Sequence, residues 1–275
     1  MRKFSLGLLM AVVITACPKR ETRLTAGEAQ QALEESAAAS QAEGLTATSV
    51  DIATSFTIGA GVERATDELS NSIAAALPCA DVSSHDQPYT ITVEHGVSGD
   101  CSYRGQELTG TARIVVSRND ENEVVVEHEW SDLSNGVVTL NGTAEVTWNL
   151  QAQTRHVVHH TSWTSMRTGR HVEGEGDRLQ SVLEGGLREG IAVDGSRSWT
   201  GERGTWDLAI DGVEMRWADP VPQAGTYTLS TPFDKVVDMS FARVDDDTIR
   251  VTVASGHRDF TFTVSKLGVV ARSSP

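Results

Sequence analysis

The chain is poor in basic residues for its length. Its 275 residues include 23 Lys and Arg against 38 Asp and Glu, which gives a formal net charge of −15 at pH 7. A surface that binds the phosphates of nucleic acid needs a stripe of Lys and Arg, and clusters of the same residues attract anionic lipid head groups. We therefore expect no nucleic acid partner and no direct electrostatic attachment to anionic lipid.

Catalytic sequence motifs are also missing. The chain contains no Gly-x-Ser-x-Gly elbow, no His-Glu-x-x-His, no phosphate-binding P-loop and no Gly-x-Gly-x-x-Gly after a strand. Serine, histidine and aspartate occur throughout, but a catalytic triad is defined by geometry and not by composition. We predict a non-enzymatic protein without catalytic residues and without a cofactor.

Long hydrophobic runs are absent beyond the N-terminus. There, Arg2 and Lys3 precede an apolar run at Phe4–Ile14, and the run leads into the quartet Ile14-Thr-Ala-Cys17. A run of roughly eleven residues matches the core of a signal peptide and is short for a transmembrane helix. We predict a signal for export, and an ordinary secretory signal is one form that it can take.

The quartet at residues 14–17 resembles the lipobox of bacterial lipoproteins that signal peptidase II processes: a branched aliphatic residue, two small residues and a cysteine. The resemblance implies a signal peptide over residues 1–16 and a diacylglyceryl group on the Cys17 thiol, usually with acylation of the freed amine. It therefore implies a membrane partner reached through N-terminal lipid. Several acyl chains give stable anchoring where one chain is marginal.

Cysteine is scarce, and only three occur in the chain. If Cys17 carries lipid, Cys79 and Cys101 remain, and two cysteines in an exported chain most simply form a disulfide. Closing a loop of this size stabilises a fold by about 3 kcal/mol in the chain-entropy model. Two free buried thiols are the alternative. No His stands at ligand spacing beside either cysteine, so we expect no metal site.

The N-terminal third predicts helices. Residues 17–46 are polar and Ala-rich, and Thr25-Ala-Gly-Glu28 has the form of a capping box. We predict a tether and a short, weakly docked helix there, with a disordered tether as the alternative. Val, Ile, Thr and Phe in residues 47–58 predict a strand. Apolar residues recur at helical spacing over 62–77, until Pro78 ends the pattern.

From Tyr89 onward, apolar and polar residues alternate almost to the end, as over residues 136–150. This period of two is typical of antiparallel strands with one packed face and one wet face. We predict a mainly β protein: a large antiparallel, curved sheet (meander or open half-barrel) with one or two N-terminal helices. Residues 47–275 would form a single β-rich globular domain.

Several glycines mark the connections and irregularities of this sheet. Asn135-Gly136 and Asp211-Gly212 carry the chemistry of tight turns. Gly110 and Gly142 interrupt alternating strands, and isolated strand glycines often mark bulges or bends.

A run of histidines is the most suggestive segment for chemistry. On a strand, His156 and His160 share one face about 13 Å apart, and His159 points the other way. That separation is too large for one metal ion, so a metal-dependent enzyme would need His128 or His171 from neighbouring strands. We favour a row of surface or half-buried histidines.

The features together predict a membrane-anchored envelope lipoprotein, a non-enzymatic structural or binding module whose ligand the sequence does not indicate. The chain also resembles envelope lipoproteins of Gram-negative bacteria in its general run. Pro18 replaces the aspartate associated with inner-membrane retention, which favours the outer membrane over the inner.

The alternative is a lipid or lipoprotein carrier with an open β half-barrel cavity, which the order of helix and meander resembles in architecture alone. An open apolar cavity in the sheet would favour the carrier. A concave face filled by the protein's own helices would argue against it.

Overall fold

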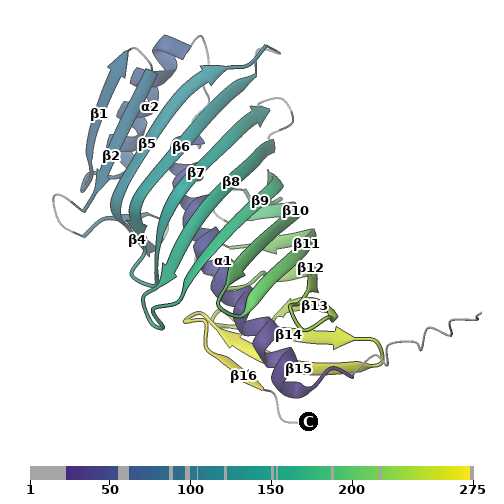
Figure 1. Ribbon diagram of the computed structural model, residues 1–275. Helices are drawn as coiled ribbons and strands as arrows, with labels where there is room; N and C mark the ends of the chain where they lie inside the picture. Colours follow the sequence, from purple (N-terminus) through teal and green to yellow (C-terminus); the bar gives the residue numbers. More distant parts are fainter. Residues whose placement is uncertain are drawn as a thin grey trace, which may run out of the picture.

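A computed structural model describes residues 23–54, 62–86, 89–96, 100–103, 105–120, 123–149, 152, 154–186, 189–216 and 219–272. These residues form a 14-stranded sheet, a two-stranded ribbon and two helices (Figure 1). The strand order in the large sheet is β1-β2-β5-β6-β7-β8-β9-β10-β11-β12-β13-β14-β15-β16. Neighbours along the chain therefore pair in turn, all antiparallel, and the sheet is not closed. The predicted fold class is confirmed.

The helices are α1 (Ala26–Thr54) and α2 (Val62–Ala76). The first strands are β1 (Asp81–Asp86), β2 (Tyr89–His95), β3 (Ser102–Tyr103), β4 (Gln106–Glu107), β5 (Thr109–Arg118), β6 (Val124–Ser134), β7 (Val138–Asn149) and β8 (Thr154–Ser165). The remaining strands are β9 (His171–Val182), β10 (Ile191–Gly201), β11 (Gly204–Met215), β12 (Ala224–Ser230), β13 (Val236–Arg243), β14 (Thr248–Ser255), β15 (Arg258–Ser265) and β16 (Val270–Arg272).

Helix α1 differs most from expectation. It spans 29 residues, so the predicted strand over 47–58 is wrong for residues 47–54, and residues 55–58 lie outside the described part. The helix also runs through the expected boundary between residues 46 and 47. Its first turn has the predicted capping box, because the Glu28 amide donates to Thr25 Oγ1 at 3.2 Å and the Thr25 amide donates to Glu28 Oε2 at 2.8 Å.

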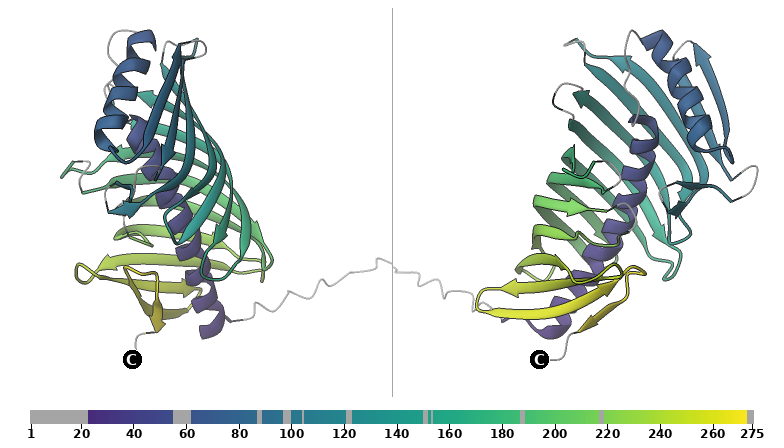
Figure 2. Two further views of the ribbon diagram at one scale, coloured as in Figure 1. Left: turned by 90° about the vertical axis from the view of Figure 1, so that its left-hand side faces the viewer. Right: turned by 180° about the vertical axis from the view of Figure 1, so that it is seen from behind.

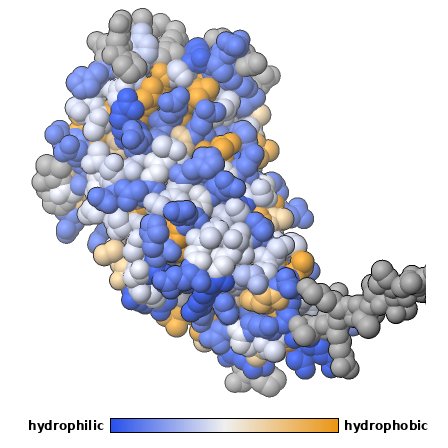
Figure 3. Space-filling model, in the orientation of Figure 1, coloured by the Kyte–Doolittle hydropathy of each residue, from blue (hydrophilic) through white to orange (hydrophobic). Residues whose placement is uncertain are grey.

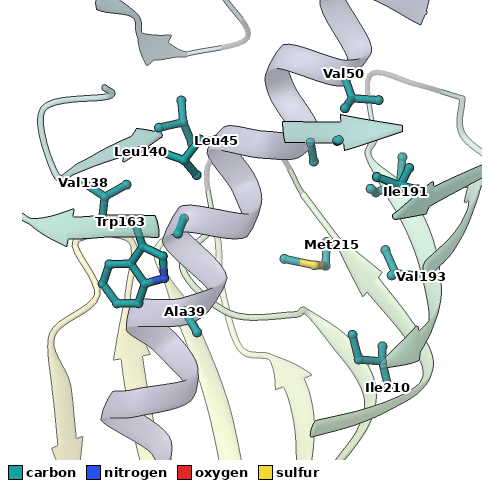
Figure 4. Packing of buried hydrophobic residues seen from close by; sticks show 14 of the residues in the cluster. Ala39, Leu45, Val50, Val138, Leu140, Trp163, Ile191, Val193, Ile210 and Met215 are labelled. Atoms are coloured by element: carbon teal, nitrogen blue, oxygen red, sulfur yellow. The ribbon is translucent and has the colours of Figure 1, made fainter. Parts of the chain in front are cut away.

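The weakly docked helix of our prediction is in fact the centre of the core. The sheet twists so strongly that its first half lies on one side of α1 and its second half on the other (Figures 1 and 2). Leu45 and Val50 of α1 are fully buried; Leu45 lies beside Leu140, and Val50 lies on the other side of the helix toward Ile191 (Figure 4). Burial on every side outweighs the strand preference of the β-branched residues near its end.

Helix α2 confirms the prediction for residues 62–77, and it ends at Ala76, two residues before Pro78. It packs on β1, β2 and β5 through Leu69 and Ile73, whose exposure is 0%. The predicted disulfide is also present. Cys79 and Cys101, with Cα atoms 5.2 Å apart, join the end of α2 to the start of β3.

The strand glycines lie at irregularities, as predicted for Gly110 and Gly142. Both face the bulged part of β6, where the register shifts between Trp130 and Leu133 and Asp132 has a φ of 50°. The predicted turn at Asp211-Gly212 is wrong, because β11 continues through it with a bulge. The Gly212 amide donates there to Asp194 Oδ1 at 2.7 Å.

Alanine at Gly142 should destabilise the fold strongly. The φ of this glycine is +143°, and a Cβ there would lie 2.3 Å from the His160 carbonyl oxygen, a backbone atom of the adjacent strand. We expect Gly142→Ala to lower the free energy of unfolding by about 3 kcal/mol, from backbone strain and overpacking together. Urea unfolding followed by circular dichroism measures the change.

Gly27→Ala is the matched control, because a Cβ at Gly27 of α1 would meet nothing within 4 Å. It should change the free energy of unfolding by less than about 1 kcal/mol, in the stabilising direction. Equal urea midpoints for the two variants would contradict the pairing of β7 with β8 described here.

Candidate functional site

The residues that the sequence singled out lie in different places: one is outside the described part of the chain, and the histidines are divided between two faces of a strand. Cys17, the predicted lipid attachment site, lies outside the described residues. His156 and His160 lie on the outer face of β8, with side chains 50% and 69% exposed, and His159 points inward with its side chain 6% exposed. The alternation predicted for this strand is therefore confirmed.

The outer histidines have acidic neighbours rather than a metal site. His156 Nε2 lies 2.6 Å from Asp177 Oδ1, and His160 Nδ1 lies 3.6 Å from Glu175 Oε2. Within the described ranges, no three His, Cys, Asp or Glu side chains converge as a metal site would require. His156 and His160 take part instead in separate surface pairs with β9.

The concentrated polar chemistry lies inside the fold, between α1 and the concave face of the sheet. Glu35, Glu43 and Asp51 of α1 are 1%, 6% and 0% exposed. Buried carboxylates are tolerated when they are paired and hydrogen-bonded, and the sheet supplies partners to all three. We call this set of contacts the buried polar seam.

Glu35 is held by two arginines from connections at one end of the sheet. Arg170, between β8 and β9, donates to Glu35 Oε2 at 2.6 Å, and Arg203, between β10 and β11, donates to Oε1 at 3.3 Å. Arg170 is 20% exposed at its side chain and Arg203 is 49% exposed. This end of the seam therefore reaches the surface and carries one more positive charge than negative.

Glu43 lies at the middle of the seam. Its Oε1 contacts Arg178 of β9, whose side chain is 1% exposed, and its Oε2 lies 3.4 Å from His159 Nε2. Asp51, near the end of α1, lies 3.5 Å from the Arg155 guanidinium and accepts a hydrogen bond from the Tyr103 hydroxyl at 2.9 Å. The three carboxylates thus contact different parts of the sheet: two of its connections, then β9 with β8, then β8 with β3.

Arg197 of β10 is a buried cation of another kind. Among the described residues it has no carboxylate contact; it donates to Ser40 Oγ at 2.9 Å and lies over the rings of Trp199 and Tyr227 at 5.5 and 5.4 Å. Burial lowers the pKa of its guanidinium. The seam is therefore locally cationic, although the whole chain carries −15.

A cavity of 520 Å³ lies beside the exposed end of the seam, between α1 and four sheet connections. No helix in the described part of the chain is long and apolar enough to cross a membrane.

Comparison with known protein families, with curated proteins and with solved structures finds no match to this chain.

Removing one partner of the Glu43–Arg178 pair should lower the free energy of unfolding more than removing both partners. Glu43→Leu leaves Arg178 as an unpaired buried charge, and Arg178→Met does the same to Glu43. We expect each variant to lose about 3–5 kcal/mol of unfolding free energy, and the double variant to recover most of that loss. Denaturant unfolding of the four proteins in a double-mutant cycle measures the coupling.

The exposed pair Arg113–Glu129, with side chains 45% and 58% exposed, provides the control. Glu129→Ala should change the free energy of unfolding by less than about 1 kcal/mol. Additive losses in the Glu43 and Arg178 variants would show that the two side chains are not coupled.

The free energy of unfolding should decrease as the pH falls, because two histidines are buried. Burial lowers the pKa of His95 to about 4, and burial followed by the charge of Arg155 lowers the pKa of His128 to about 3. Both groups take up protons in the unfolded chain near pH 6.5, so their contribution is complete above that pH. It is lost as the pH falls toward 4 and 3, at about 2 kcal/mol per group by pH 5.

Burial and the charge of Arg197 also lower the pKa of His159 to about 4, and the charge of Glu175 opposes them. We base this prediction on His95 and His128 because His159 lies 3.4 Å from the Glu43 carboxylate, so replacing it would also disturb that contact. In His128→Leu, the loss of unfolding free energy between pH 7 and pH 5 should shrink by about 2 kcal/mol. His160→Gln, on the outer face, should keep the wild-type slope. An unchanged slope in His128→Leu would contradict the assignment.

Proposed function

We propose that this chain is an envelope lipoprotein anchored through lipid on Cys17, at the outer membrane rather than the inner one, and that it serves as a non-enzymatic binding module. The observation that carries the proposal is the quartet at residues 14–17, which follows a charged start and an apolar run. The resemblance to the lipobox gives the cysteine its role, and the position of the quartet fits the layout of a signal peptide.

The disulfide supports an exported location. Cys79 and Cys101 are bonded, and structural disulfides persist in oxidising compartments outside the cytoplasm. The tether between anchor and body is short: the nine residue-to-residue steps from Cys17 to Ala26 can span at most about 30 Å. The folded body would therefore stay close to the membrane surface.

The surface and the interior both argue against a carrier role. On the face shown in Figure 3, most side chains are hydrophilic or neutral and the apolar patches are separate. The concave face, where a half-barrel carrier would hold its cargo, is occupied by α1 and its ion pairs. Because the sheet is curved and open, a lipid or lipoprotein carrier is the second candidate. Cargo on the concave face, however, would have to displace α1 and break its ion pairs with the sheet.

Replacing Cys17 should abolish lipid attachment. In cells labelled with palmitate, Cys17→Ser should lose all label and leave the membrane fraction, because the thiol that carries the diacylglyceryl group is gone. The wild-type chain should be labelled, and its mass should match residues 17–275 with lipid added. Palmitate labelling, mass spectrometry and membrane fractionation measure these outcomes.

The double variant Cys79→Ser, Cys101→Ser is the matched control, because it removes two cysteines and leaves the quartet intact. It should be labelled as strongly as the wild type. If the wild-type chain carries no label, and Cys17→Ser pellets with membranes as the wild type does, the lipoprotein proposal fails.

A further inference from the structure

The cavity beside α1 lies between hairpins in the middle of the sheet and the last turn of the sheet. Its floor is formed by α1 between Glu34 and Gln41. One wall is formed by the tips of the β6–β7 and β8–β9 hairpins, which are tied together because the Met166 amide donates to the Val137 carbonyl at 2.9 Å. The opposite wall is the β15–β16 turn, residues 267–270.

This opposite wall is seated directly on the helix. Gly268 has a φ of +73° and lies so close to α1 that a Cβ on it would be 2.6 Å from Gln41 Nε2. The Gly268 amide donates to the Ser265 carbonyl at 2.8 Å, which fixes the turn. The cavity is therefore bounded by packed elements on its floor and both walls.

The rim of the cavity is apolar and exposed. Val137, Met166, Leu267 and Val269 are 42%, 60%, 86% and 55% exposed, and all four line the cavity. They are four of the seven large apolar side chains that are exposed in the described part of the chain. Apolar side chains gathered on one site indicate an interaction, whereas scattered ones do not.

One end of the cavity is cationic. Arg167, Arg170 and Arg203 line it, together with the single carboxylate of Glu34. Arg170 and Arg203 share Glu35, and the Arg170 Nε is buried without a hydrogen-bond partner among the described residues. With Glu34 and Glu35 both counted, this end keeps one positive charge in excess, in a chain of net charge −15.

We propose that this cavity is a binding site for a single-chain amphiphile with an anionic head, namely a long-chain carboxylate. The alkyl chain would lie against the rim and over Ala37 and Ala38 of α1, and the carboxylate would accept hydrogen bonds from Arg167 and Arg203. The inference names a ligand class for the binding module proposed above, and so rests on that proposal.

The size and chemistry of the site favour this ligand over a protein. Pockets for small molecules enclose about 300–1,000 Å³, and the 520 Å³ found here lies within that range. A stable protein interface buries upward of about 1,000 Å², more than four rim side chains provide. Methionine adapts well to a flexible chain, and guanidinium groups bind carboxylates through two parallel hydrogen bonds.

Photocrosslinking on the full chain tests the site. Isolated membranes that carry the protein are incubated with a C16 carboxylate bearing a photoactivatable diazirine on its alkyl chain, and the labelled residues are located by mass spectrometry. We expect label on Val137, Met166, Leu267 or Val269, and we expect excess palmitate to compete it away. A photoactivatable C16 alcohol should label these residues about tenfold less, because it lacks the charge that the arginines recognise.

Two pairs of substitutions separate the rim from general surface apolarity. Met166→Asn with Leu267→Asn should lower labelling about tenfold. Leu179→Asn with Val236→Asn, at exposed apolar positions outside the cavity, should leave labelling unchanged.

Arg167→Gln with Arg203→Gln should lower labelling by the carboxylate about tenfold and leave labelling by the alcohol unchanged. Thermal unfolding checks that every variant is folded.

Three outcomes would overturn the proposal: label outside the cavity, equal labelling by alcohol and carboxylate, or rim labelling by a photoactivatable phosphatidylcholine in place of the free acid. The last would make the rim a contact surface for the bilayer. Labelling is read on the chain from whichever fraction contains it. Failure of the lipid anchor, which palmitate labelling of Cys17 reports, is therefore distinguishable from failure of the cavity.

Discussion

The structure depends on the pairing of α1 carboxylates with cations of the sheet. Glu28, Glu35, Glu43 and Asp51 follow one another at intervals of seven and eight residues, which is about 11–12 Å along a helix. Each meets a cation from a different part of the sheet: Lys235 at 2.5 Å, Arg170 with Arg203, Arg178, and Arg155. Small residues between them let the backbone of α1 approach the strands, so the helix and the curvature of the sheet define each other.

These pairs specify position more than they add net stability. Taking two charges out of water costs several kcal/mol per ion, and the attraction between them only roughly offsets that cost. A helix that slid by one turn, however, would leave several buried charges unpaired at once, which is a far larger penalty. The buried faces of α1 carry mostly small side chains, which give the helix little steric registry of its own, and we infer that the carboxylates provide it.

The sheet and the disulfide could be predicted from sequence because their signals are local. Alternation identified the strands, and export with an even cysteine pair identified Cys79–Cys101. Helix α1 could not be predicted in full, because its buried positions carry mainly small and polar residues, so its faces differ little in hydrophobicity, and residues 45–53 are buried on every side. Its carboxylate spacing was visible, but it has meaning only beside Arg155, Arg178 and their neighbours, which are more than a hundred residues away. Asp211-Gly212 was misread because bulges and tight turns use the same positive-φ residues.

The same pairs connect the proposed anchor to the proposed site. Glu28 with Lys235, and the Leu24 carbonyl with Arg258 at 3.3 Å, hold the chain at the first turn of α1, so the tether ends in the core and not on a loose arm. The floor of the cavity begins at Glu34, about 12 Å further along the helix. With a tether of at most about 30 Å, the cavity of an anchored chain stays within a few tens of ångströms of the bilayer. Long-chain carboxylates partition into that bilayer, so the anchor would hold a weak binding site at high effective ligand concentration. Strong affinity would then be unnecessary, and an open cavity with an apolar rim would suffice.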